Sequence, residues 1–110
     1  MSGVGSRLVF EDDRVRVWHL DLEPGEQCEQ HTHQLDYVAR IVAGSTVEVL
    51  GPRGESLYTV TREPGDAVAF QVEGDQIVTS GPDSRTIPAT HSARNVGDQT
   101  FREVLVEFKK

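Results

Sequence analysis

The feature that most constrains the fold is an alternation of apolar and polar residues with a period of two, repeated in short segments along the chain. Successive side chains of a β-strand point to opposite faces, so this period is typical of strands. Residues with strong turn preferences separate the segments at intervals of roughly ten residues. The segments with this pattern are residues 14–22, 38–43, 47–49, 57–61, 67–72, 77–79, 86–87 and 101–108.

Many short strands with regular turns predict an all-β fold, either a sandwich or a barrel. No segment has the period of an amphipathic helix of useful length. The chain has 110 residues, which is close to the commonest domain size and allows one modest core. We therefore expect a single domain over residues 1–110, with its core spanning about residues 8–108.

The charge balance limits the classes of partner. Eleven Lys and Arg residues against eighteen Asp and Glu residues give a formal net charge of −7, which argues against a nucleic-acid backbone or an anionic membrane as a partner.

No apolar run reaches the roughly 18 residues of a transmembrane helix. The first residues lack the pattern of a secretory signal, and the lone Cys28 forms no internal disulfide. We expect a cytoplasmic protein.

A His-x-His pair, His31 and His33, follows the turn at Pro24-Gly25. Residues i and i+2 of a strand share one face about 6.6 Å apart, so two imidazoles can reach one metal ion. The alternative is a solvated surface pair. His91, near the other end of the chain, is the candidate for a third ligand from a neighbouring strand. His19, the fourth histidine, is expected to be structural.

The glycines and histidines around this pair resemble the motifs of the cupin family. The first motif is Gly-x5-His-x-His-x3-Glu-x6-Gly, and the matching residues are Gly25, His31, His33 and Gly44. The second motif ends in His-x3-Asn, which is matched by His91 and Asn95, and the usual Gly-Asp turn between the motifs is matched by Gly65-Asp66. The resemblance implies a double-stranded β-helix, or jelly roll, with a metal ion held by His31, His33 and His91.

Two departures from the cupin pattern bear on function. Tyr37 stands where the first motif has its metal-binding glutamate, and residues 67–90 form a long connection to His91. We interpret Gly74 to Asp83 as an inserted hairpin near the mouth of the pocket. The run His-x-His-x-x-Asp-Tyr-Val resembles a subgroup of small single-domain cupins that includes one linked to β-alanine degradation.

Three neutral imidazoles suit a divalent transition metal better than magnesium or calcium. Iron is the first expectation, and nickel, zinc, copper, manganese and cobalt are the alternatives. Without a carboxylate ligand the site keeps the full charge of the metal and favours an anionic chelating substrate. The resemblance implies a non-haem dioxygenase acting on a small dicarbonyl, hydroxy-keto or carboxylate metabolite. The alternatives are a cupin that binds metal and ligand without turnover, and a metal-dependent isomerase or lyase.

Three other residues near the histidines, Tyr37, Glu29 and Asp36, have two interpretations each. Tyr37 is a candidate catalytic residue that donates a hydrogen bond to the substrate, or it packs in the core. Glu29 is on the same face as His31 and His33, so it either orients a ligand histidine or is a solvated charge at the rim. Asp36 is an alternative fourth ligand, although simple alternation points it outward. Asn95 is expected to tie backbone at the end of its strand.

Open sheet edges in a small sandwich need to be covered, and small cupins commonly pair. We therefore expect a homodimer. The residues expected at the contact are Trp18, Leu20 and Val42.

Overall fold

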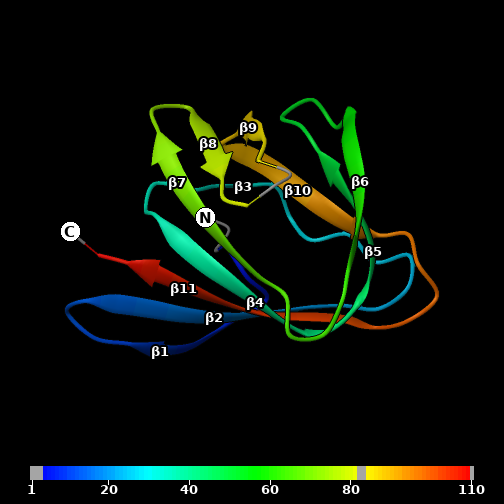
Figure 1. Ribbon diagram of the computed structural model, residues 1–110, viewed down its shortest axis with the longest axis horizontal. Coiled ribbons are helices and arrows are strands. Elements are labelled where there is room, and N and C mark those ends of the chain that lie inside the picture. The colour runs from blue at the N-terminus through cyan, green and yellow to red at the C-terminus, as the bar shows by residue number, and fades with distance from the viewer. Residues whose placement is uncertain (1–3, 82–83, 110) are drawn as a thin grey trace.

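The computed structural model describes residues 4–81 and 84–109, and in that part of the chain the regular structure consists of strands alone. The strands are β1 (Arg7–Glu11), β2 (Val15–Leu22), β3 (His31–Thr32), β4 (Tyr37–Ala43), β5 (Ser45–Leu50), β6 (Ser56–Arg62), β7 (Ala67–Glu73), β8 (Gln76–Thr79), β9 (Thr86–Pro88), β10 (Thr90–Asn95) and β11 (Phe101–Phe108). Two layers of strands are visible in Figure 1, so the predicted all-β sandwich is confirmed. The described residues include no helix of the length and apolarity that crossing a membrane requires.

The two sheets are antiparallel and are joined at a tight corner. One sheet has the order β1-β2-β11-β4-β7-β8-β9 and the other the order β3-β10-β5-β6. The chain passes from the first sheet to the second at Gly44, which lies between β4 and β5. A Cβ atom at Gly44 would overlap the carbonyl oxygen of Arg62. Only glycine therefore fits this corner.

The core lies between the sheets and takes alternate residues from the central strands. On β11, Phe101 and Leu105 are buried, whereas Arg102 and Phe108 are exposed. The same alternation continues on the neighbouring strands, and the buried apolar residues include Leu20, Leu22, Ala39, Ile41, Val47, Ile77 and Ile87. The end of this core nearest to β3 and β10 is where the histidines gather.

Two of the residues that we expected at a dimer contact have side chains that point into the monomer instead. Leu20 belongs to the core, and Trp18 packs against it while its indole N–H donates a hydrogen bond to the Glu107 carboxylate at 2.6 Å. Both faces of β2 carry apolar residues, and the face with the bulkier side chains is the buried one. The expectation is therefore wrong for Leu20, whereas Trp18 is partly buried and packs against the core. Val42 is 52% exposed and lies on the surface.

The segment predicted as an inserted hairpin, Gly74 to Asp83, begins with the hairpin turn that joins β7 to β8. Gly74 has a φ of 67° in the turn between β7 and β8, and β9 pairs with the other side of β8. β8 lies within this segment and extends the seven-stranded sheet, and β9, which follows the segment, is the edge strand of that sheet. Its residues 82–83 lie outside the described residues. Just beyond them, the guanidinium of Arg85 lies 4.1 Å from the ring centre of Tyr58.

Asn95 ends β10 and is fully buried, at 0% exposure. Its side-chain amide donates hydrogen bonds to the carbonyl oxygens of Leu22 at 2.9 Å and Gln99 at 2.7 Å. Its side-chain oxygen accepts hydrogen bonds from the Ser45 hydroxyl at 2.9 Å and the Gly97 N–H at 3.0 Å. The prediction that Asn95 ties backbone at the end of its strand is confirmed.

Candidate metal centre

Pairing between two strands that are far apart in the sequence builds the histidine cluster. β3 and β10 are antiparallel neighbours, and His31 lies directly opposite His91. Opposed residues of an antiparallel pair have Cβ atoms about 5 Å apart. His33 follows β3 and stays beside the same partner, because its backbone N–H donates to the carbonyl oxygen of Ala89 at 2.9 Å. The three predicted ligand residues therefore meet in one place.

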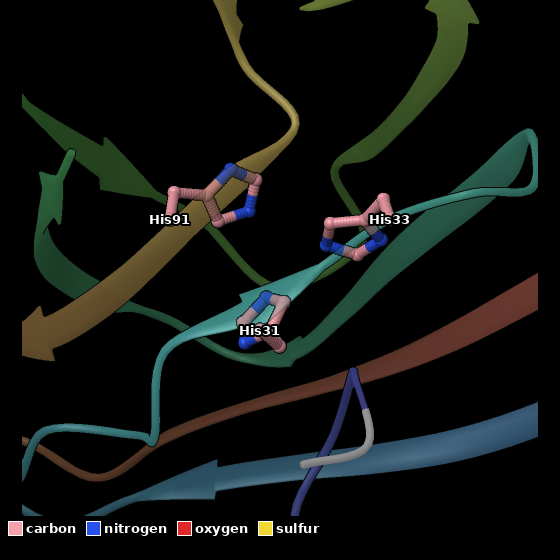
Figure 2. A group of neighbouring side chains, drawn as sticks. All are labelled: His31, His33 and His91. Atoms are coloured by element: carbon pink, nitrogen blue, oxygen red, sulfur yellow. The ribbon is translucent and has the colours of Figure 1, made fainter. Parts of the chain in front are cut away.

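The three imidazole rings face one another, and one nitrogen of each points toward the space between them (Figure 2). The ring centres are 4.8 Å apart for His31 and His33, 5.0 Å for His31 and His91, and 4.9 Å for His33 and His91. One ligand nitrogen from each ring can be chosen so that all three lie within 4.8 Å of one another. Nitrogens about 2.1 Å from one ion lie roughly 3.0–3.4 Å apart, so small ring movements would suffice.

Hydrogen bonds to backbone carbonyls determine which ring nitrogen His31 and His91 can present to a metal ion. Nδ1 of His31 lies 2.9 Å from the carbonyl oxygen of Glu29, and Nδ1 of His91 lies 2.8 Å from that of Pro88. A carbonyl oxygen only accepts, so each Nδ1 carries the proton and each Nε2 has a free lone pair. Nδ1 of His33 is buried and has no hydrogen-bond partner among the described residues. The two backbone carbonyls therefore orient His31 and His91 so that each presents Nε2 as a possible ligand atom.

All three histidines are neutral near neutral pH. Burial lowers the pKa of His33 to about 2, and the neighbouring His91 and His31 add to this effect. Burial also lowers the pKa of His91 to about 4 and lowers that of His31, against the opposing effect of their backbone hydrogen bonds. The neutral imidazole is the form that binds a metal ion. The donor set therefore fits a divalent transition metal.

The histidines open into a cavity of about 90 Å³ between the two sheets. Most of its wall is apolar and includes Ile41, Val47 and Leu105. Other polar groups on the wall include the side chains of Tyr37, Tyr58, Arg62 and Glu103. This volume is below the usual range of about 300–1,000 Å³ for drug-sized ligands, so the cavity suits a small metabolite.

Comparison with known proteins identifies the fold. No protein-family model matches the chain, and no curated protein matches it. A cupin domain from Bordetella pertussis Tohama I is similar over 100% of this chain and 99% of its own, with 22% identity and a TM-score of 0.67. An RmlC-like cupin family protein with a double-stranded β-helix fold from Methanocaldococcus jannaschii is similar over 93% and 76%, with 14% identity and a TM-score of 0.59. The chain has the cupin fold.

A third similar structure is the polyketide cyclase RemF from Streptomyces resistomycificus, with 18% identity, a TM-score of 0.54 and coverage of 90% of this chain and 57% of that one. At these identities the likeness carries the cupin fold and no activity. The resemblance to the subgroup with the β-alanine degradation cupin stays a prediction. The structure and the comparisons together show a three-histidine cluster in a cupin fold.

Tyr37 occupies the position of the cupin glutamate and is held between two other rings. Its ring centre lies 4.2 Å from that of His33 and 4.3 Å from that of Phe70, and the interplanar angles are 12° and 7°. Burial, and then the negative charge of Glu103, raise the pKa of Tyr37 well above its ordinary value. Its hydroxyl therefore keeps its proton and is a hydrogen-bond donor. The packing interpretation is confirmed, and the catalytic role stays a prediction.

Asp36 lies outside the cluster of ligand atoms. One oxygen of its carboxylate accepts a hydrogen bond from the backbone N–H of Val72 at 2.8 Å, which ties the start of β4 to β7. Alternation predicted the outward orientation of Asp36, and the alternative of Asp36 as a fourth ligand is wrong in this structure.

Glu29 contacts the cluster through its backbone. Its carbonyl oxygen is the acceptor that holds His31, so the orienting role predicted for this residue is performed by the main chain. The Glu29 residue is otherwise exposed. A catalytic role for its carboxylate stays a prediction.

Sequence reasoning missed two carboxylates that point inward from β11. Glu103 lines the cavity, and Glu107 is 3% exposed. Burial raises the pKa of Glu103 to about 7, against the opposing charge of Arg62. The signal was present in the sequence, because residues 103 and 107 have the same parity as Phe101 and Leu105.

Proposed function

We propose that this cupin is a metal-dependent enzyme, a non-haem dioxygenase for a small chelating metabolite with a dicarbonyl, hydroxy-keto or carboxylate group. The observation that carries the proposal is the convergence of three neutral imidazoles on the wall of a mostly apolar cavity. Structural metal sites are usually closed by a fourth protein ligand, whereas catalytic sites keep a position open. Among the described residues, no carboxylate or thiol joins the three histidines.

A metal ion bound here would have three neutral imidazole ligands and would face a mostly apolar cavity. Fe(II), when bound, supplies Lewis acidity and a route for electrons to O2. Nickel, zinc, copper, manganese and cobalt suit the same ligands. Because the ligand set carries no negative charge, the site attracts an anionic group that chelates through two oxygens. The apolar wall strengthens that attraction by excluding water.

We infer that Tyr37 donates a hydrogen bond to the oxyanion that develops on the substrate. The stack of His33, Tyr37 and Phe70 holds the ring in one orientation, so the hydroxyl is pre-positioned. A donor aimed at a developing negative charge lowers the barrier because it does not need to reorganise during the reaction.

The proposal predicts O2 consumption by the Fe(II)-loaded protein in the presence of a 1,3-dicarbonyl or hydroxy-keto compound. The metal in the purified native protein is first identified by mass spectrometry, and O2 uptake is then followed with an electrode over a panel of such compounds. Absence of uptake with iron, nickel, copper and manganese would favour a cupin that binds metal and ligand without turnover. Conversion of a compound without O2 uptake would favour the isomerase or lyase alternative.

Replacing Tyr37 with phenylalanine is expected to lower turnover by about tenfold or more, because one oxyanion donor is lost. Metal content should stay close to one ion per chain, since the phenol is not a ligand. The paired variant Tyr37→Glu restores the cupin glutamate and should bind metal more tightly and the anionic substrate more weakly. Equal turnover of Tyr37→Phe and the unaltered protein would show that Tyr37 only packs.

We also propose that the protein is a cytoplasmic homodimer. β1 is an edge strand of the seven-stranded sheet, every one of its residues is exposed, and three of them are Leu8, Val9 and Phe10. Such an edge favours pairing with the same edge of a second copy. We expect sedimentation velocity to find about twice the 12.2 kDa chain mass, and Phe10→Lys to shift the protein to the monomer. A monomer alone at micromolar concentration would contradict the proposal.

A further inference from the structure

The two inward glutamates of β11 differ in what they contact. Glu107 accepts a hydrogen bond from the indole of Trp18 at 2.6 Å and lies 3.9 Å from the guanidinium of Arg16. Glu103 lines the same cavity as the histidines, and within residues 4–81 and 84–109 no group donates a hydrogen bond to its carboxylate. Glu103 is half-buried, and it lines the cavity that the histidines also line.

The elements packed around Glu103 present both apolar and ionisable side chains to it. Its cross-strand neighbours are Leu20 on β2 and Ile41 on β4. Arg62 on β6 is the cation that acts on Glu103. The ionisable groups whose pKa the charge of Glu103 raises are Tyr37 on β4, Tyr58 on β6 and Cys28 before β3.

This environment gives Glu103 a protonation equilibrium suited to proton transfer. Burial raises its pKa to about 7, and Arg62 limits the rise. Near neutral pH the residue is present both as carboxylate and as carboxylic acid, which is the condition under which a general base works best. The tyrosines and Cys28 stay protonated because their pKa values are raised.

We propose that the carboxylate of Glu103 is the proton acceptor of this cavity and removes a C–H proton next to a carbonyl group of the small ligand held at the histidines. The inference rests on the proposed function in one respect, namely that the ligand contacts a metal ion bound by the histidines. It names the substrate class more narrowly: the ligand has an acidic C–H beside its chelating oxygens.

In this step the C–H bond breaks and the proton forms an O–H bond with the Glu103 carboxylate. The electron pair of the C–H bond moves to the carbonyl oxygen and gives the enolate form of the ligand. No oxidant is consumed, and the reverse reaction returns a proton to carbon. In D2O the returning particle is a deuteron, so the ligand acquires deuterium.

The test uses hydroxyacetone as the probe and the full chain loaded with Zn(II), without O2, so that redox chemistry plays no part. Deuterium incorporation in D2O is followed by proton NMR. We expect Glu103→Gln to lower the exchange rate at least about tenfold with unchanged zinc content, since a positioned base contributes about 10²–10⁴-fold. The matched control is Glu73→Gln, which removes an exposed carboxylate on β7 and should leave the rate unchanged.

A second readout does not depend on bound metal. In the metal-free protein labelled with ¹³C at glutamate carboxyls, one resonance should titrate with a midpoint of about 7 and be absent from Glu103→Gln. Arg62→Met should move that midpoint upward, because the cation favours the carboxylate. The exchange rate should rise with pH through the same midpoint in the unaltered protein.

The outcomes separate this inference from the proposed function. Equal exchange rates for Glu103→Gln and the unaltered protein, with zinc bound to both, would overturn the inference and leave the metal centre intact. A Glu103 midpoint in the ordinary range of glutamate would overturn it as well. Failure of the unaltered protein to bind zinc would instead overturn the proposed function, and the carboxyl titration would still decide the acid–base state of Glu103.

Discussion

Replacing His91 with alanine is expected to remove most of the metal from the purified protein while the two sheets stay folded. His91 lies opposite His31, and the fully buried apolar core residues lie outside β3 and β10. Loss of a residue that merely supports a ligand weakens metal binding about 10–100-fold, so loss of a ligand itself should cost at least as much. Metal stoichiometry by mass spectrometry and far-ultraviolet circular dichroism measure the two effects.

The chain supplies its own control for that experiment. His19 is the remaining histidine and lies on β2, where its Nδ1 is 3.1 Å from a guanidinium nitrogen of Arg7. His19→Ala removes an imidazole of the same chemistry from outside the cluster, so it should keep its metal. Full metal stoichiometry in His91→Ala, or loss of metal in His19→Ala, would show that the cluster is not the metal site.

Replacing Asn95 with alanine is expected to destabilise the fold by about 3–4 kcal/mol. The substitution removes four hydrogen bonds at a fully buried position. It leaves the carbonyls of Leu22 and Gln99 without that partner, and a buried group left unsatisfied costs about 1–3 kcal/mol. Because small domains are stable by only about 5–15 kcal/mol, the effect should be plain in the urea midpoint.

The neighbouring residue Gln99 provides the comparison for Asn95. Gln99 takes part in this network through its backbone carbonyl, while the residue itself is exposed. Gln99→Ala should therefore change the free energy of unfolding by less than about 0.5 kcal/mol. A similarly small change for Asn95→Ala would mean that water replaces the amide at no cost, contrary to the burial of the site.

The sequence predicted the strands well where one side of each strand is buried, because burial imposes the period of two. It also predicted the meeting of His31, His33 and His91, and the inward orientation of Tyr37 despite the break between β3 and β4. β1 was not predicted. All five of its residues are exposed, so no buried face gave them a clear alternation.

The roles of single side chains were harder to predict than the strands. The sequence did not say which apolar face of β2 is internal, and Leu20 was placed on the wrong side for that reason. Glu103 and Glu107 were overlooked because charged residues are rarely buried, although their parity on β11 points them inward. The indole of Trp18, which donates a hydrogen bond to Glu107, and Arg62, whose charge acts on Glu103, lie on other strands and are brought close only by the fold.

The shortness of β3 has a consequence for the lifetime of the protein. β3 has two residues and lies at an edge of the four-stranded sheet, beside β10. A metal ion shared by His31, His33 and His91 would fasten this edge to β10 as a removable cross-link. Free metal at a hundred times its Kd adds about 2.7 kcal/mol of stability by mass action. In metal-starved cells this cross-link would be absent, so we expect the β3 edge to be more accessible to proteases there than in metal-replete cells.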